Sequence, residues 1–111
     1  MKYKITVEDA IQKLATEKKQ HFTTLMERGT LSVEYYAPIQ TDAQQPHMQD
    51  ELYIIISGTG IFYRGGERIT FKPADILFVP AGMEHRFENF TADFATWVIF
   101  YGACGGEKDD R

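Results

Sequence analysis

Residues 45–56 read QPHMQDELYIII, a polar stretch with a histidine and a glutamate that runs directly into an apolar one. In an extended segment every second side chain faces the same way, so we expect the odd-numbered side chains from Gln45 to Ile55 to share one face. An ionised Glu51 on a buried face would be costly without a partner, and His47 together with a cation is a natural one. The alternative places Glu51 in water at the mouth of the strand.

A second stretch, residues 74–89, reads ADILFVPAGMEHRFEN. Its apolar strand ends at Pro80, Gly82 allows a tight turn, and His85 opens the next strand. We therefore expect His85 to point into the interior close to the turn, where it could meet the residues of the first stretch.

The rest of the sequence predicts one helix followed by strands. Apolar residues recur at helical spacing between Val7 and about Lys18, which indicates a short amphipathic helix. Turn residues divide the remainder, with Gly65-Gly66 the strongest hairpin signal. About eight short strands follow, at 22–27, 31–37, 52–56, 61–64, 68–71, 76–79, 86–90 and 94–101. This pattern is typical of an all-β sandwich or closed barrel.

Composition narrows the class of protein. The chain has 111 residues, enough for one domain, and a formal net charge of −4. Its charges are interspersed, which argues against a nucleic-acid footprint or a polybasic membrane patch. Cys104 is the single cysteine, and the N-terminus lacks the apolar run of a signal peptide, so we expect a cytoplasmic protein. The expected partner is a small molecule, with no nucleic acid and no membrane.

Together the two stretches resemble the paired motifs of the cupin superfamily. In the first motif a histidine precedes a glutamate, which is separated by six residues from a glycine, as in His47, Glu51 and Gly58. The spacing of the second motif is kept in Pro80, Gly82, His85 and Asn89. Two motifs in the right order are far more specific than either alone. The resemblance implies a small single-domain cupin β-barrel (a double-stranded β-helix or jelly roll) within 1–111, with an N-terminal helical segment at 1–21, the barrel at 22–103 and a flexible tail at 104–111.

Three positions depart from the family pattern. Ile39 and Ala74 stand where the motifs have glycine, and Gln45 replaces the first histidine of the first motif. The usual ligand set of three histidines and one glutamate thus becomes Gln45, His47, Glu51 and His85. The resemblance implies one divalent transition metal, and two histidines with one carboxylate favour Fe or Mn first, with Zn or Ni possible. Gln45 would add a weak fourth ligand or leave its place to water. In the alternative, the two histidines hydrogen-bond to Glu51 without metal.

The resemblance implies a metal-dependent enzyme, dioxygenase-like, an isomerase or a lyase, that acts on a small oxygenated metabolite. The catalytic residue is unknown, and Tyr53, Gln49 and Glu84 are weak candidates. The alternative is a non-catalytic small-molecule-binding cupin, with or without metal. We interpret His21, at the junction of helix and first strand, as an exposed or capping residue.

Residues 94–101 are apolar on both faces of the predicted strand. One face can line the barrel, and the helix or another chain must cover the other. The family resemblance adds the expectation of a homodimer.

Overall fold

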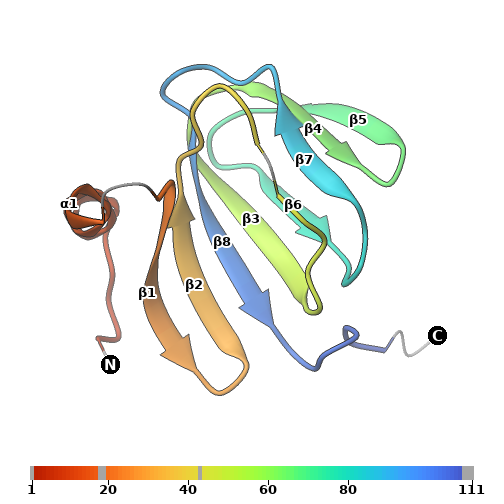
Figure 1. The fold of residues 1–111 in the computed structure, drawn as a ribbon, viewed down its shortest axis with the longest axis horizontal. Helices are drawn as coiled ribbons and strands as arrows, with labels where there is room; N and C mark the ends of the chain where they lie inside the picture. The colour runs from red at the N-terminus through yellow and green to blue at the C-terminus, as the bar shows by residue number, and fades with distance from the viewer. Residues whose placement is uncertain (1, 18–19, 43, 109–111) are drawn as a thin grey trace.

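One helix and eight strands make up the described part of the chain, residues 2–17, 20–42 and 44–108, in this computed structural model (Figure 1). They confirm the all-β fold with a single N-terminal helix. The elements are α1 (Val7–Thr16), β1 (Phe22–Arg28), β2 (Leu31–Tyr36), β3 (Asp50–Ser57), β4 (Gly60–Arg64), β5 (Glu67–Phe71), β6 (Ile76–Val79), β7 (His85–Glu88) and β8 (Ala95–Tyr101).

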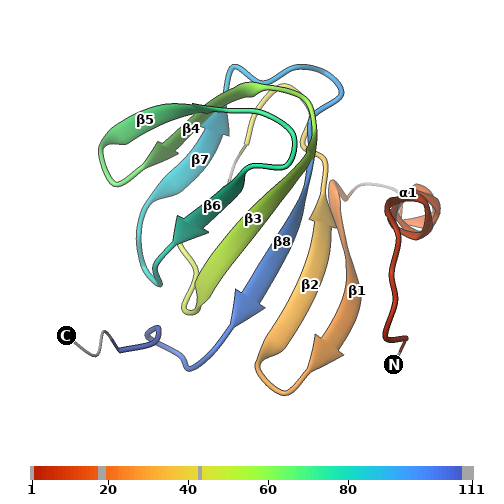
Figure 2. The same cartoon turned by 180° about the vertical axis from the view of Figure 1, so that it is seen from behind.

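The strands form two antiparallel sheets around a common interior. The larger sheet has the order β1-β2-β8-β3-β6 and the smaller has the order β5-β4-β7. Figures 1 and 2 show the smaller sheet at one end of the larger one, with α1 outside the opposite edge. Tyr53 and Val98 of the larger sheet pack in one buried cluster with Phe62 and Phe87 of the smaller. This arrangement is the jelly roll that the sequence predicted.

The predicted alternation holds within β3. Glu51, Tyr53 and Ile55 are buried and face the interior, whereas the residues between them are only half-buried. The rings of Tyr53 and Phe87 lie 4.8 Å apart between their centres, edge to face. The inner face of β3 therefore joins the aromatic core to the carboxylate of Glu51.

The prediction that residues 45–49 are extended and continue the inward face of β3 is wrong. Strand β3 begins only at Asp50, and residues 44–49 are irregular. Pro46 has no N–H to give to a strand ladder. Gln49 instead donates side-chain hydrogen bonds to the carbonyl oxygens of Thr30, at 2.9 Å, and Gly102, at 3.0 Å. Residues 44–49 are thus a loop that crosses one end of the barrel.

Two positions of the family motifs, 58 and 74, lie in turns. A Cβ atom on Gly58 would lie 2.6 Å from the Cα atom of Phe94, so only glycine fits there. Ala74, where the family pattern has glycine, keeps the left-handed conformation with φ at 74°. For an alanine that conformation costs roughly 1–2 kcal/mol, so the turn is retained in spite of the substitution.

The helix covers only part of the outer face of the larger sheet. Thr6 and Asp9 form a capping box at its start, and Ala10 is buried in a second cluster with Tyr35 and Ala95. On β6, Ile76 and Phe78 stay 64% and 42% exposed. Ala95 and Trp97 of β8 belong to the cluster that contains Ala10 of α1, and the expected homodimer stays a prediction.

The residues that follow β8 are held against the loop before β3. The amide of Gly105 donates to the carbonyl oxygen of Met48 at 2.6 Å, and that of Glu107 donates to the Asp50 carboxylate at 2.9 Å. These contacts join residues 105 and 107 to the barrel, and the expected flexibility of the tail from residue 104 onwards stays a prediction; residues 109–111 lie outside the described residues. Among the described residues, no helix has both the length and the apolar character needed to cross a membrane.

Candidate metal centre and its cavity

His47, Glu51 and His85 come together inside the barrel. Each offers one ligand atom, and these three atoms all lie within 4.8 Å of one another. His47 belongs to the loop before β3, Glu51 to the start of β3 and His85 to the start of β7. The structure thus places side by side the three residues that the two sequence motifs singled out.

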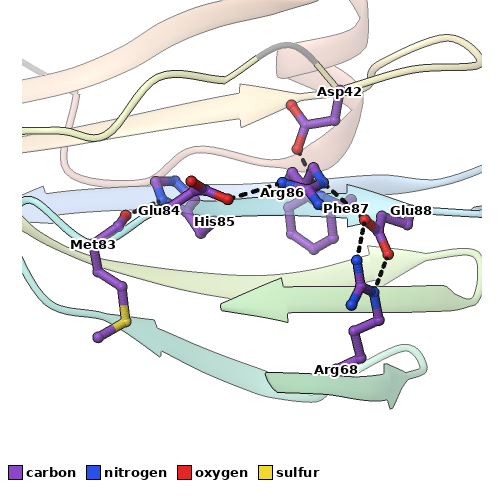
Figure 3. A network of polar contacts seen from close by, with 8 residues as sticks. All are labelled: Asp42, Arg68, Met83, Glu84, His85, Arg86, Phe87 and Glu88. Atoms are coloured by element: carbon purple, nitrogen blue, oxygen red, sulfur yellow. Dashed lines mark hydrogen bonds and ion pairs between the residues drawn. The ribbon is translucent and has the colours of Figure 1, made fainter. Parts of the chain in front are cut away.

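A hydrogen bond on the side of the ring away from Glu51 fixes the orientation of His85. Its Nδ1 lies 2.8 Å from the carbonyl oxygen of Met83 (Figure 3). A carbonyl oxygen can only accept, so Nδ1 carries a proton and donates it. In the neutral ring Nε2 is then unprotonated, and this atom faces the interior, 2.8 Å from Oε1 of Glu51.

Glu51 and His85 are almost fully buried, at 1% and 2% exposure. Although the distance between them is short, its direction is unfavourable: His85 Nε2 and Glu51 Oε2 have no hydrogen-bond partner. Burial alone would lower the pKa of His85, but the Glu51 carboxylate and the Met83 carbonyl outweigh it and raise that pKa. Two buried electron-rich groups so close together need positive charge between them.

The donor set fits a divalent cation. Two neighbouring ligand atoms around a metal with bonds of about 2.1 Å lie about 3 Å apart, close to the separation of Glu51 and His85. One carboxylate with two imidazoles suits several first-row transition metals. Met83 supplies the backbone carbonyl that commonly orients a metal-binding histidine.

His47 lies on the irregular loop and is only half-buried. Its backbone carbonyl accepts a hydrogen bond of 2.7 Å from the amide of Gly82, in the turn before His85. Its ring centre lies 4.6 Å from that of Phe100 and 5.9 Å from that of His85. The two motifs therefore touch through their backbones as well as through their side chains.

Asp42 ties the crossing loop to both sheets. Its carboxylate accepts hydrogen bonds from the Tyr36 hydroxyl at 2.5 Å and the Gln44 amide at 2.9 Å. It also accepts one from the Phe87 backbone amide at 2.8 Å (Figure 3). Burial, followed by the hydrogen bond to Asp42, raises the pKa of Tyr36. Gln44 in turn accepts a hydrogen bond of 2.9 Å from Tyr53. This network holds the loop that carries His47.

A cavity of about 840 Å³ opens beside the group. His47 lies in its wall, together with inner-face side chains of β1, β2 and β8. Val98 and Phe100 make part of the wall apolar, and several glutamine amides make part of it polar. A cavity of this size and mixed character can take a small molecule.

The residues proposed for catalysis have other partners. Tyr53 is fully buried, and burial, followed by the charge of Glu51, raises its pKa well above the ordinary range, so its hydroxyl stays protonated. The Gln49 amide is occupied by two backbone carbonyls. Glu84 pairs with Arg86 at 3.1 Å in the polar network of Figure 3.

The structure places Gln45, the expected fourth ligand, at an exposed position in the cavity wall. The amide that reaches the interior hydroxyl of Tyr53 belongs to the neighbouring Gln44. Whether Gln45 binds metal stays a prediction.

Sequence reasoning missed Glu34. This half-buried residue of β2 lines the cavity, and burial, followed by the negative charge of Glu51, raises its pKa. Ser32, Glu34 and Tyr36 alternate along one face of β2, and this pattern could have indicated that Glu34 faces the interior. His21 is exposed, as expected, but it also lies in the cavity wall.

Comparisons with known proteins identify the family and agree with the fold. The family model described as "Cupin domain" matches residues 32–101. An uncharacterized protein of Streptomyces coelicolor is 37% identical over 60 residues, which are 54% of this chain and 57% of that protein. The match thus spans little more than half the length of that relative.

Solved structures resemble the fold. A "Cupin 2 conserved barrel domain protein" from Salinispora arenicola has a TM-score of 0.63 and 21% identity, over 74% of this chain and 75% of its own. A "putative mannose-6-phosphate isomerase" from Ralstonia eutropha has a TM-score of 0.59 and 25% identity, over 70% of this chain and 78% of its own.

Proposed function

The chain belongs to the cupin family, and from this premise we propose that it is a metal-dependent enzyme acting on a small oxygenated metabolite. His47, Glu51 and His85 would hold one divalent transition metal. Two imidazoles with one carboxylate make Fe(II) or Mn(II) the first choice and Zn(II) or Ni(II) the second.

The observation that carries the proposal is the unsatisfied pair inside the barrel. Nε2 of His85 and Oε2 of Glu51 are buried without a hydrogen-bond partner, and Nδ1 of His85 is already committed to Met83. Proteins rarely leave buried polar atoms in this state without a functional reason. A cation shared with His47 would satisfy both atoms at once.

When bound, a divalent ion would supply Lewis-acid or redox chemistry at positions that three protein ligands leave open. The residues of the chain would do the rest. Val98 and Phe100 would keep water from one side of the cavity, and Gln45 would offer an exposed amide to substrate oxygens. Oxygenation, isomerisation and bond cleavage by a lyase are all compatible with such a site, and the Ralstonia eutropha structure named as a putative isomerase favours the second.

A second function, binding without catalysis, is favoured by one specific observation. Tyr53 and Gln49 are both engaged in structural hydrogen bonds, so neither is free to act as an acid or base. The same cavity and metal group would then serve as a receptor for a small metabolite.

The test is metal content measured by elemental mass spectrometry after reconstitution of the full chain with Fe(II), Mn(II) or Zn(II). We expect about one equivalent in the wild type and almost none in His47→Ala or His85→Ala. His21→Ala is the matched control, since this histidine lines the same cavity but lies outside the group, and it should keep its metal. Metal retained in both of the first two variants would refute the site.

Turnover separates the two functions. Oxygen uptake by the Fe(II) form, together with product analysis on a panel of hydroxy and oxo acids, would identify an enzyme. A ligand-induced rise in melting temperature without turnover would identify a receptor.

A further inference from the structure

The cavity beside the metal group has an uneven distribution of charge. Glu34 is an acidic residue of its wall, and among the described residues that line it there is no lysine or arginine. The other polar groups of the wall are amides, hydroxyls and the rings of His21 and His47. Apart from these two rings, the described wall therefore offers a ligand no cationic side chain.

Glu34 lies on the inner face of β2, between Thr24 of β1 and Val98 of β8. It is half-buried, and none of the ion pairs among the described residues involves it. A carboxylate in such a position has lost part of its hydration without gaining a cationic partner. A ligand can provide that partner.

The sheet fixes how far Glu34 lies from the metal group. Val98 of β8 pairs with Glu34 on one side and with Tyr53 of β3 on the other, and Glu51 is the next inward residue of β3. Two strand spacings across the sheet and two residues along β3 separate Glu34 from Glu51, about 12 Å between the backbones. Both carboxylate side chains extend inward, and of the metal group His47 lines the cavity, so a ligand of about five backbone atoms could reach from Glu34 towards the metal group.

With a metal bound, the electrostatic charge near the metal group and the charge near Glu34 would have opposite signs. A divalent ion more than offsets the charge of Glu51, so the metal end is positive and attracts an anionic oxygen. At the other end Glu34 is negative and attracts a cation. A phosphate or a second carboxylate placed there would meet a like charge in a partly desolvated site.

We propose that Glu34 is the specificity-determining residue of this cavity, and that it selects a small ligand with a protonated amine at one end and a metal-binding oxygen at the other. The inference rests on the proposed function, because the oxygen end requires the metal. It narrows the substrate class from small oxygenated metabolites to amine-bearing ones and excludes phosphate esters and dicarboxylates.

The experiment uses three probes with the same five-carbon backbone: 5-aminopentanoate, glutarate and pentanoate. Their tails are a protonated amine, a carboxylate and a methyl group. Isothermal titration calorimetry on the metal-loaded full chain should show 5-aminopentanoate binding at least about tenfold more tightly than the other two. In Glu34→Gln the preference should fall to within about threefold, whereas Ser32→Ala, on the same face of β2 and in the same wall, should keep it.

Each outcome decides. Tighter binding of glutarate than of 5-aminopentanoate would overturn the inference. Equal binding of the three probes, binding of none, or a preference that survives in a folded Glu34→Gln would overturn it as well. Metal content is measured in the same samples: if the wild type takes up no metal the proposed function itself fails, whereas loaded protein without an amine preference defeats this inference alone. The probe ranking in the wild type tests the proposal even if Glu34→Gln does not fold.

Discussion

Glu51→Gln should stabilise the metal-free protein and at the same time abolish its metal binding. In the wild type the Glu51 carboxylate is buried with Oε1 2.8 Å from Nε2 of His85, and Oε2 has no hydrogen-bond partner. A glutamine amide has nearly the same shape but carries no charge, so burying it in this position costs less than burying the carboxylate. The hydrogen bond from Nδ1 to Met83 is unaffected by the change.

The size of the effect follows from the burial of the pair. An unsatisfied buried polar group costs about 1–3 kcal/mol, and more when it is charged. Relieving it should raise the free energy of unfolding of the metal-free protein by about 1–3 kcal/mol. For a domain of about 100 residues each kcal/mol raises the melting temperature by about 4–8 °C.

Urea unfolding followed by circular dichroism, with chelator and again with Mn(II), measures both effects. With metal at about 1,000 times its dissociation constant, the wild type should gain about 4 kcal/mol and Glu51→Gln nothing. A loss of about 3–5 kcal/mol in chelator would refute the reasoning, because it would identify Glu51 and His85 as a structural ion pair. Asp50→Asn is the matched control. This neighbouring buried carboxylate accepts from the amides of Ala81 and Glu107, so its replacement should destabilise the protein by about 1–3 kcal/mol.

Three further predictions concern other positions. Gln45→His should tighten Zn(II) binding by more than the roughly tenfold that an outer-shell partner contributes, measured by competition with a chromophoric chelator; unchanged affinity would show that residue 45 points elsewhere. The raised pKa of Glu34 means that its ionisation opposes folding at neutral pH, so Glu34→Gln should be more stable than the wild type in urea at pH 7. That advantage should fade as the pH falls towards about 4, and a more stable wild type at pH 7 would contradict it. If the exposed β6 face forms a homodimer, Ile76→Glu should give a monomer in light scattering, whereas Ile11→Glu, at a similarly exposed site on α1, should not.

The regular elements could be predicted from the sequence because local patterns determine them. The helix begins at Val7 as expected, and Thr6 and Asp9, three residues apart, form the capping box at its start. The glycine pair at 65–66 closes the β4–β5 hairpin, with both residues at positive φ. These features depend on neighbours within a few residues, so a single sequence is enough to find them.

The loop before β3 could not be predicted in the same way, because distant residues determine its path. Alternation suggested that Gln45 and Gln49 share the inward face of Glu51. In the structure Thr30 and Gly102 bind the Gln49 side chain, and both are far from it in the sequence. Glu34 was missed for a related reason: its importance depends on the neighbouring strand β8 and on Glu51 beyond it.

The metal group lies at the end of the barrel where the strands stop and loop residues make the hydrogen bonds. Gly82 donates to the carbonyl of His47, and the carboxylate of Asp42 accepts from the amide of Phe87 at the edge of the smaller sheet. Residues 44–49 therefore close the barrel without being a strand, and His47 is free of the alternation that a strand would impose. A ligand side chain on such a loop can adjust to a bound ion, whereas Glu51 and His85, on strands, are held in place. Because Glu51 and His85 are held on strands, their unsatisfied atoms are buried in the interior. Because His47 is on the loop, it stays half-buried at the cavity wall.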